Sequence, residues 1–319
     1  MKRILLTTTA LALTFGASSA FAMGNAEIDL GGSSKWTYND SDDGSEAAGG
    51  ENNTSFGITN SITVGSSASS DSGLTYGTSL TLETGGGAVN DDGMKLFVKG
   101  SFGELRTGSG GAGDSYGLNA DGSVEGESNY SGTLGSSVAK AGDSSISYFT
   151  PSISGFKAAV SYTDAGTDSK ADSTELAIAF TTDVGDASAG LNFVTAATDG
   201  DGADSGSGDD MSFGATYSLN DFALRLAVNS SETENTDGTT ASDKESVGFG
   251  LSYQVSDAMK FGLYSIDTEN NADDSEVSEV AASLTYVIAP GLSTNLAHTS
   301  WEDNDDSGST TSAYIKVAF

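Results

Sequence analysis

Apolar and polar residues alternate along most of this chain, in short stretches that recur up to the last residue. One stretch places Phe56, Ile58 and Ile62 on one face, with polar residues and Gly57 between them. A repeat of two is the side-chain period of a β-strand. Similar stretches begin near residues 26, 74, 96, 105, 145, 156, 176, 187, 211, 222, 247, 259, 280, 292 and 311. The pattern predicts an all-β chain of about sixteen strands, and bacterial barrels have an even strand number.

The connections between these stretches differ in length in a regular order. Short joints lie near residues 103–104, 151–154, 183–186, 220–221, 256–257 and 289–291. Long connections lie between them, at residues 39–53, 84–93, 109–143, 164–173, 197–209, 231–245, 267–277 and 301–310. Short turns at one rim and long loops at the other are typical of antiparallel transmembrane β-barrels of the outer membrane. A soluble β-sandwich gives no reason for this segregation, so we expect the membrane barrel.

The N-terminal segment predicts export. Lys2 and Arg3 precede a mostly apolar run, and Ala20-Phe21-Ala22 matches the small-residue pattern of a cleavage site. We therefore expect residues 1–22 to be a cleaved signal peptide and residues 23–319 to form the barrel. The remaining chain has no run of about 18 apolar residues, so a membrane crossing must use strands.

Charge and composition exclude several classes of function. The chain has 45 acidic and 13 basic residues and a net charge of −32. Nucleic-acid binding needs clustered Lys and Arg that neutralise phosphates, so nucleic acid is excluded as a partner. The chain has no Cys and one His, and its sequence contains no nucleophile motif. We expect no enzyme activity, no catalytic residues and no required cofactor.

Acidic residues crowd the long connections. Hard oxygen ligands at such density suit Ca²⁺ or Mg²⁺, and bound ions would link the protein to anionic lipopolysaccharide. The residues with the spacing of weak divalent sites are Asp199, Asp201, Asp303 and Asp305. A solvated acidic surface explains the same residues equally well.

Two motifs resemble the Gram-negative trimeric general porins, in particular the alphaproteobacterial type. Residues 97–108, FVKGSFGELRTG, are similar to the hairpin that leads into that family's third loop, and residues 145–156, SISYFTPSISGF, to the next hairpin. The last strand, ending in Phe319, resembles the signal that the barrel assembly machinery recognises. The resemblance implies a homotrimer in the outer membrane. It also implies a water-filled channel for passive diffusion of small hydrophilic solutes and ions. Ser109 departs from the family pattern, which often has Arg there.

The connection at residues 109–143 is the only one long enough to fold inward and narrow the lumen. Its acidic candidates for the pore constriction are Asp114, Asp121, Glu125 and Glu127. Strand parity turns basic residues into the lumen, and the candidates for a basic pore wall are Lys35, Lys99, Arg106, Lys157 and Arg225. A transverse field between the two sets would orient dipolar solutes. A mobile external loop is the alternative.

A secreted or surface-attached calcium-binding β-rich adhesin is the main alternative function. It would explain the export signal and the acidic, Gly-rich connections, but it does not explain their alternating lengths. A β-helix would also show a fixed short repeat, and none is present in the sequence. A barrel with an enzyme site is a second alternative, which lacks a catalytic constellation.

Overall fold

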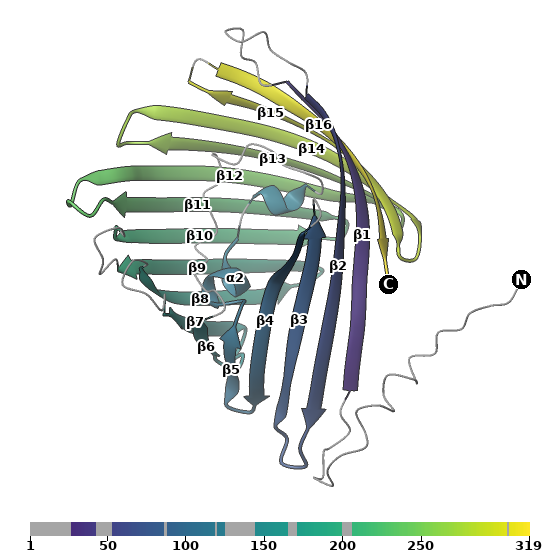
Figure 1. Ribbon diagram of the computed structural model, residues 1–319, viewed down its shortest axis with the longest axis vertical. Helices are drawn as coiled ribbons and strands as arrows, with labels where there is room; N and C mark the ends of the chain where they lie inside the picture. The colour runs from purple at the N-terminus through teal and green to yellow at the C-terminus, as the bar shows by residue number, and fades with distance from the viewer. Residues whose placement is uncertain are drawn as a thin grey trace, which may run out of the picture.

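A computed structural model describes residues 27–42, 53–85, 88–118, 120–124, 144–164, 171–199, 206–304 and 306–319. In these ranges the chain forms a closed antiparallel barrel of sixteen strands, in which each strand pairs with its sequence neighbours and β1 pairs with β16 (Figure 1). The predicted all-β transmembrane barrel is therefore confirmed. The predicted signal peptide, residues 1–22, lies outside the described residues.

The strands vary widely in length. In chain order they are β1 (Glu27–Asp42), β2 (Asn53–Ser69), β3 (Thr75–Gly85), β4 (Ala88–Gly100), β5 (Gly103–Gly108), β6 (Ser145–Phe149), β7 (Phe156–Thr163), β8 (Asp172–Val184), β9 (Ala187–Asp199), β10 (Gly208–Leu219), β11 (Phe222–Glu234), β12 (Thr240–Ser256), β13 (Met259–Asn270), β14 (Ser275–Ala289), β15 (Leu292–Asp303) and β16 (Asp306–Ala318). Two short helical segments, α2 (Ala112–Tyr116) and η2 (Asp121–Ser123), follow β5. Within the described ranges, no helix has the length and apolar character needed to cross a membrane.

The two ends of the chain meet at one seam. β1 and β16 pair in register, with Lys35 opposite Lys316. Beyond β16, the Phe319 N–H donates to the Gly32 carbonyl at 3.0 Å, and the Gly32 N–H donates to the Phe319 carbonyl at 2.9 Å. A closed barrel leaves no strand edge unpaired in lipid, so the terminal residue extends the closure of the wall.

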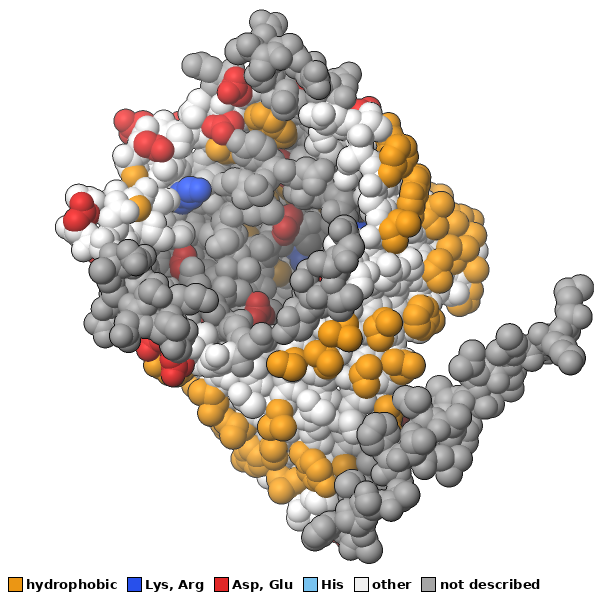
Figure 2. All heavy atoms as spheres, viewed as in Figure 1, with side chains coloured by type: hydrophobic (Ala, Val, Ile, Leu, Met, Phe, Trp, Pro, Cys, Tyr) orange, Lys and Arg blue, Asp and Glu red, His pale blue; other side chains and the backbone are white. Residues whose placement is uncertain are grey.

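Large apolar side chains lie on the outer face of the wall. Phe56, Leu96, Leu226 and Leu296 are exposed there, and Figure 2 shows hydrophobic side chains gathered on the outer wall. Aromatic side chains also pack across strands, as in the pair Phe222 and Tyr253, whose ring centroids are 4.3 Å apart. Such a surface is stable against hydrocarbon and would be unfavourable in water.

Two clusters of buried apolar residues lie inside the barrel, where the segment after β5 meets the wall. One cluster joins Ala112 to Phe149, Ala159, Ala177, Val194 and Ala196. A second joins Ala120 to Tyr264, Ile266 and Ala281. Alanines make up half or more of each cluster, which leaves room for a second layer of chain within the lumen.

Four predicted long connections are wrong in extent. Residues 84–93, 231–245, 267–277 and 301–310 are mostly strand, because the hairpins β3–β4, β11–β12, β13–β14 and β15–β16 turn within a few residues of their tips. Both faces of these hairpin ends carry polar residues, so the apolar alternation stops although the backbone pairing continues. We call this end of the barrel the long-loop rim. The opposite end carries the turns near residues 101–102, 220–221 and 290–291, and we call it the short-turn rim.

Candidate functional site

The segment that follows β5 lies along the inner wall of the barrel. α2 contacts β6, β7, β8 and β9, and η2 contacts β12 and β13. Figure 1 shows α2 within the ring of strands. Residues 125–143 of the expected inward loop, with its candidates Glu125 and Glu127, lie outside the described residues. The described part therefore spans the inner wall from β6 to β13.

Three hydrogen bonds attach α2 to the wall. The N–H of Ala112 donates to Ser161 Oγ at 2.7 Å, and the N–H of Gly113 donates to Glu175 Oε2 at 2.9 Å. Asn192 Nδ2 donates to the Tyr116 carbonyl at 2.6 Å. The first N–H groups of a helix have no acceptor within the helix, so Ser161 and Glu175 satisfy them, and Asn192 satisfies a carbonyl group at the other end. Glu175 is only 1% exposed, so bulk water does not compete for its bond.

Glycines on the inner faces allow residues 118–124 to lie close to the wall. A Cβ at Gly250 would lie 2.5 Å from the Ala120 carbonyl oxygen, and one at Gly262 would lie 2.9 Å from the Ser123 carbonyl carbon. Both distances are too short for a real side chain. Gly214 and Gly248 provide the same clearance for Leu118 and Ala120. The sequence analysis missed these residues, although Gly at successive inward positions of the segment VGFGL, residues 247–251, was a usable signal.

Arg106 lies beside the start of the segment. Its Nη2 is 2.8 Å from Glu104 Oε1, its guanidinium lies 4.3 Å from the centre of the Phe149 ring, and its Nη1 donates to the Gly110 carbonyl. Arg106 therefore holds the chain where it enters the lumen, on the same side of the barrel as α2.

Asp114 lies in α2, where burial disfavours the negatively charged form of its side chain. Its Oδ2 accepts a hydrogen bond from the Gly111 N–H at 3.1 Å. Burial raises the pKa of Asp114 above its ordinary value; the nearby Glu175 adds to this, while the Gly111 N–H and Arg106 oppose it. An acid whose pKa is higher in the docked state binds its proton more tightly there. Docking of α2 is therefore favoured as the pH falls from the raised pKa towards the ordinary value of 3.8.

The structure brings together three of the five predicted basic residues. Lys99, Arg106 and Lys157 line one cavity of about 400 Å³ beside α2. Lys35 lies on β1, where its Nζ is 5.9 Å from the centre of the Tyr314 ring. Arg225 lies on β11. The two remaining residues are thus on other parts of the inner wall.

Four inward basic residues lie near the short-turn rim. Lys99, Lys157 and Lys260 each occupy the second position from the short-turn rim, and Lys316 lies close to the same rim. Among the described inward carboxylates, the buried Glu175, Asp210 and Glu279 lie nearer the long-loop rim. These basic and acidic residues therefore lie at different heights along the axis, which sequence parity alone did not reveal; Lys244 near the long-loop rim and Glu104 near the short-turn rim depart from this arrangement.

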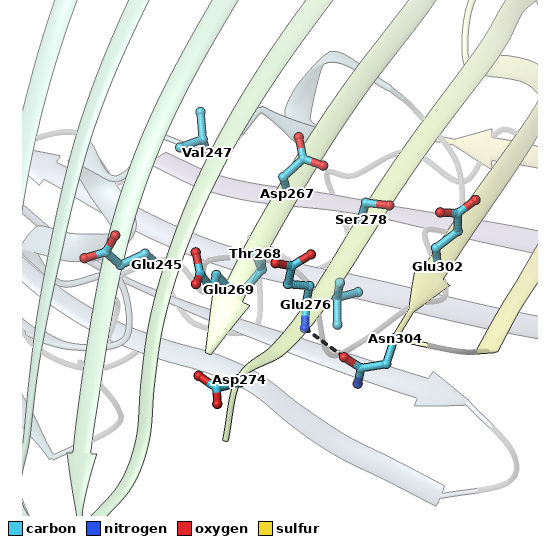
Figure 3. A pocket seen from close by; sticks show the side chains of 11 residues that line it. Glu245, Val247, Asp267, Thr268, Glu269, Asp274, Glu276, Ser278, Glu302 and Asn304 are labelled. Carbon is cyan, nitrogen blue, oxygen red and sulfur yellow. Dashed lines mark hydrogen bonds between the residues drawn. The ribbon is translucent and has the colours of Figure 1, made fainter. Parts of the chain in front are cut away.

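A second cavity, of about 680 Å³, lies at the long-loop rim of β12–β15. Glu245 is paired directly with Glu269, which is paired with Glu276, and Figure 3 shows the three side chains in a row across neighbouring strands. Directly opposed like charges weaken strand pairing unless counter-ions compensate them.

The predicted divalent residues do not meet in the described part of the chain. Asp199 ends β9 and Asp303 ends β15, and Asp201 and Asp305 lie outside the described ranges. Among the described residues, no group of three or more acidic or His side chains has an arrangement that could hold a metal ion.

Comparisons with known proteins agree with the barrel. A family model described as Gram-negative porin matches residues 7–307. The anion-selective porin from Comamonas acidovorans has 17% identity and a TM-score of 0.73, with 92% of this chain and 100% of that chain covered. The trimer form of OmpT, an outer membrane protein of Vibrio cholerae, has 15% identity and a TM-score of 0.71, with 92% and 99% covered. A mutant porin of Rhodopseudomonas blastica has 16% identity and a TM-score of 0.64, with 92% and 100% covered. Among curated protein sequences, none matches significantly.

Proposed function

Because the chain belongs to the Gram-negative porin family, we propose that residues 109–143 and the inward basic residues together form the constriction of its channel. The protein is an outer-membrane porin, a water-filled channel for passive diffusion of small hydrophilic solutes and ions. Its family and fold are those of channels, and neither supports the calcium-binding adhesin. We further propose that the protein has no enzyme activity.

The position of α2 and η2 carries the proposal. Both lie against the inner wall, and the segment that contains them reaches from β6 to β13. It brings the acidic residues Asp114 and Asp121 into the lumen, and Glu125 and Glu127 follow in sequence. Lys35, Lys99, Lys157 and Arg225 supply the positive side of the field, and Arg106 fixes the start of the segment. This field has a component along the pore as well as across it, and it orients dipolar solutes.

Neutralising three acidic residues of the constriction tests the proposal. In D121N/E125Q/E127Q we expect the ion selectivity to shift towards anions, because fixed negative charge at the narrowest point attracts cations. The reversal potential of single channels in a salt gradient measures this selectivity. A matched control, E232Q/E234Q/D237N, removes three carboxylates from the β11–β12 hairpin at the long-loop rim and should shift the potential much less. An unchanged reversal potential in the first variant would contradict the proposal.

We propose that the protein assembles as a homotrimer, since OmpT of Vibrio cholerae has a similar barrel and is known in a trimer form. We also propose that the barrel assembly machinery recognises the final strand through Phe319. The pairing of Phe319 with Gly32 supports this role, because it places the terminal residue at the seam where the wall closes.

The acidic long-loop rim is proposed to bind Ca²⁺ or Mg²⁺, which would link it to lipopolysaccharide. The opposed row Glu245, Glu269 and Glu276, which the structure describes, does not form a coordinating group, but its charge would attract such ions as counter-ions, together with the acidic positions Asp199, Asp201, Asp303 and Asp305.

Removal of divalent cations tests that proposal. EDTA should lower the temperature at which the folded protein loses its heat-resistant electrophoretic migration, because the opposed carboxylates lose their counter-ions. The variant E245Q/E269Q/E276Q should show a smaller effect of EDTA. Equal melting with and without EDTA in the unmodified protein would count against bound divalent ions.

A further inference from the structure

The cavity beside α2 has a lining suited to an anionic solute. Five strands, β3 to β7, and α2 contribute to it. Its charged residues are Lys99, Arg106, Lys157 and Glu104, so three cations face one carboxylate. A volume of about 400 Å³ lies in the range of small-molecule sites. The lining is thus positive within a protein whose net charge is −32.

Two of the three cations are available to a ligand. Arg106 already forms an ion pair with Glu104 at 2.8 Å. In the part of the chain that the structure describes, neither Lys99 nor Lys157 has an ion-pair partner. Both ammonium groups belong to side chains that are exposed to the water of the lumen. A solute with a phosphate or carboxylate group can therefore approach both without displacing a carboxylate.

Neutral donors complete the lining. The Thr150 hydroxyl oxygen accepts a hydrogen bond from the Ala158 N–H at 2.9 Å, which leaves its O–H free to donate. Tyr116 packs edge-on against Phe149, with ring centroids 6.1 Å apart. Burial raises the pKa of the Tyr116 phenol above its ordinary value; Arg106 opposes this and Glu104 adds to it. The phenol therefore stays protonated and can donate to an oxyanion.

We propose that this cavity is a binding site for a small solute that carries a phosphate or carboxylate group. The inference rests on the proposed channel function and deepens it. The site lies at the short-turn rim, which faces the periplasm. An anion that has passed the acidic long-loop rim meets there a local positive region that holds it. Paired charge-assisted hydrogen bonds from Lys99 and Lys157 would favour oxyanions over chloride.

Block of the channel current by inorganic phosphate tests the site. The full-length mature protein in planar bilayers, in potassium chloride, should show a saturable decrease of current as phosphate is added on the short-turn side. The double variant K99Q/K157Q should need about tenfold more phosphate for half block, or more, since it loses two charged donors. K99R/K157R should restore the block. K244Q, which removes an inward Lys at the long-loop rim, should leave it unchanged.

The outcomes separate this inference from the proposed function. If the unmodified channel conducts and is ion-selective but phosphate reduces the current without saturation, the binding site is wrong and the channel stands. The same follows if K99Q/K157Q and the unmodified protein are blocked equally. Absence of conductance in the unmodified protein would instead contradict the channel. Succinate in place of phosphate tells whether a carboxylate is bound as well as a phosphate.

Discussion

Gly262→Ala is expected to make the open channel noisy, because it forces η2 away from the wall. The added Cβ would lie 2.9 Å from the Ser123 carbonyl carbon and 3.0 Å from Val124 Cα. Both are backbone atoms, so no side-chain rotation relieves the overlap. Overpacking of this kind costs about 1–3 kcal/mol, which raises the undocked fraction of the segment by roughly 5- to 150-fold. Single-channel recording should show current fluctuations several times larger than in the unmodified protein.

Gly57→Ala is the matched control for this experiment. Gly57 lies in β2, and a Cβ there meets nothing within 4 Å. Both variants add the same methyl group to a strand glycine, so a difference between them reports the close approach of η2. Gly250→Ala, which meets the Ala120 carbonyl oxygen, should behave like Gly262→Ala. If Gly262→Ala is as quiet as Gly57→Ala, residues 120–124 do not control the open pore.

The wall of the barrel could be predicted because a single sequence pattern, the alternation of apolar and polar residues, determines which side chains face the lipid and which face the lumen. A strand buried against lipid must alternate, so the apolar neighbours of Lys99, Lys157 and Arg225 turn these residues inward. The pairing of Arg106 with Glu104 was also within reach of the sequence. Residues two apart in a strand share a face, so the opposite charges of Glu104 and Arg106 are neighbours on the inner face of β5. What parity does not give is which strands face each other across the lumen.

The path of the inner segment could not be predicted from strand parity. α2 has only five residues, AGDSY, which is too short for a helical repeat to appear in the sequence. Its position depends on Ser161, Glu175 and Asn192, which lie on three different strands. The small residues that make room for it, Ala159, Ala177 and Ala196, likewise lie on these three strands. The register of β7, β8 and β9, which places Ser161 directly opposite Glu175, brings them to one place.

Glu175→Ala is expected to have the largest effect on the stability of the inner segment. The substitution removes the acceptor of the Gly113 N–H, which then lies buried without that partner. Leaving a buried donor unsatisfied costs about 1–3 kcal/mol, and the removed side chain adds a void. We expect α2 to detach more often. Limited proteolysis of the folded barrel should cleave within residues 109–143 at least several times faster than in the unmodified protein.

Glu175→Gln separates hydrogen bonding from charge at this site. The amide keeps an oxygen acceptor of nearly the same shape, so cleavage should remain close to that of the unmodified protein. Loss of the negative charge should also return the pKa of Asp114 towards its ordinary value, because Glu175 is one of the groups that raise it. Docking of α2 would then depend less on pH. If Glu175→Gln were cleaved as fast as Glu175→Ala, and both faster than the unmodified protein, the charge of Glu175, and not its hydrogen bond to Gly113, would hold α2 against the wall.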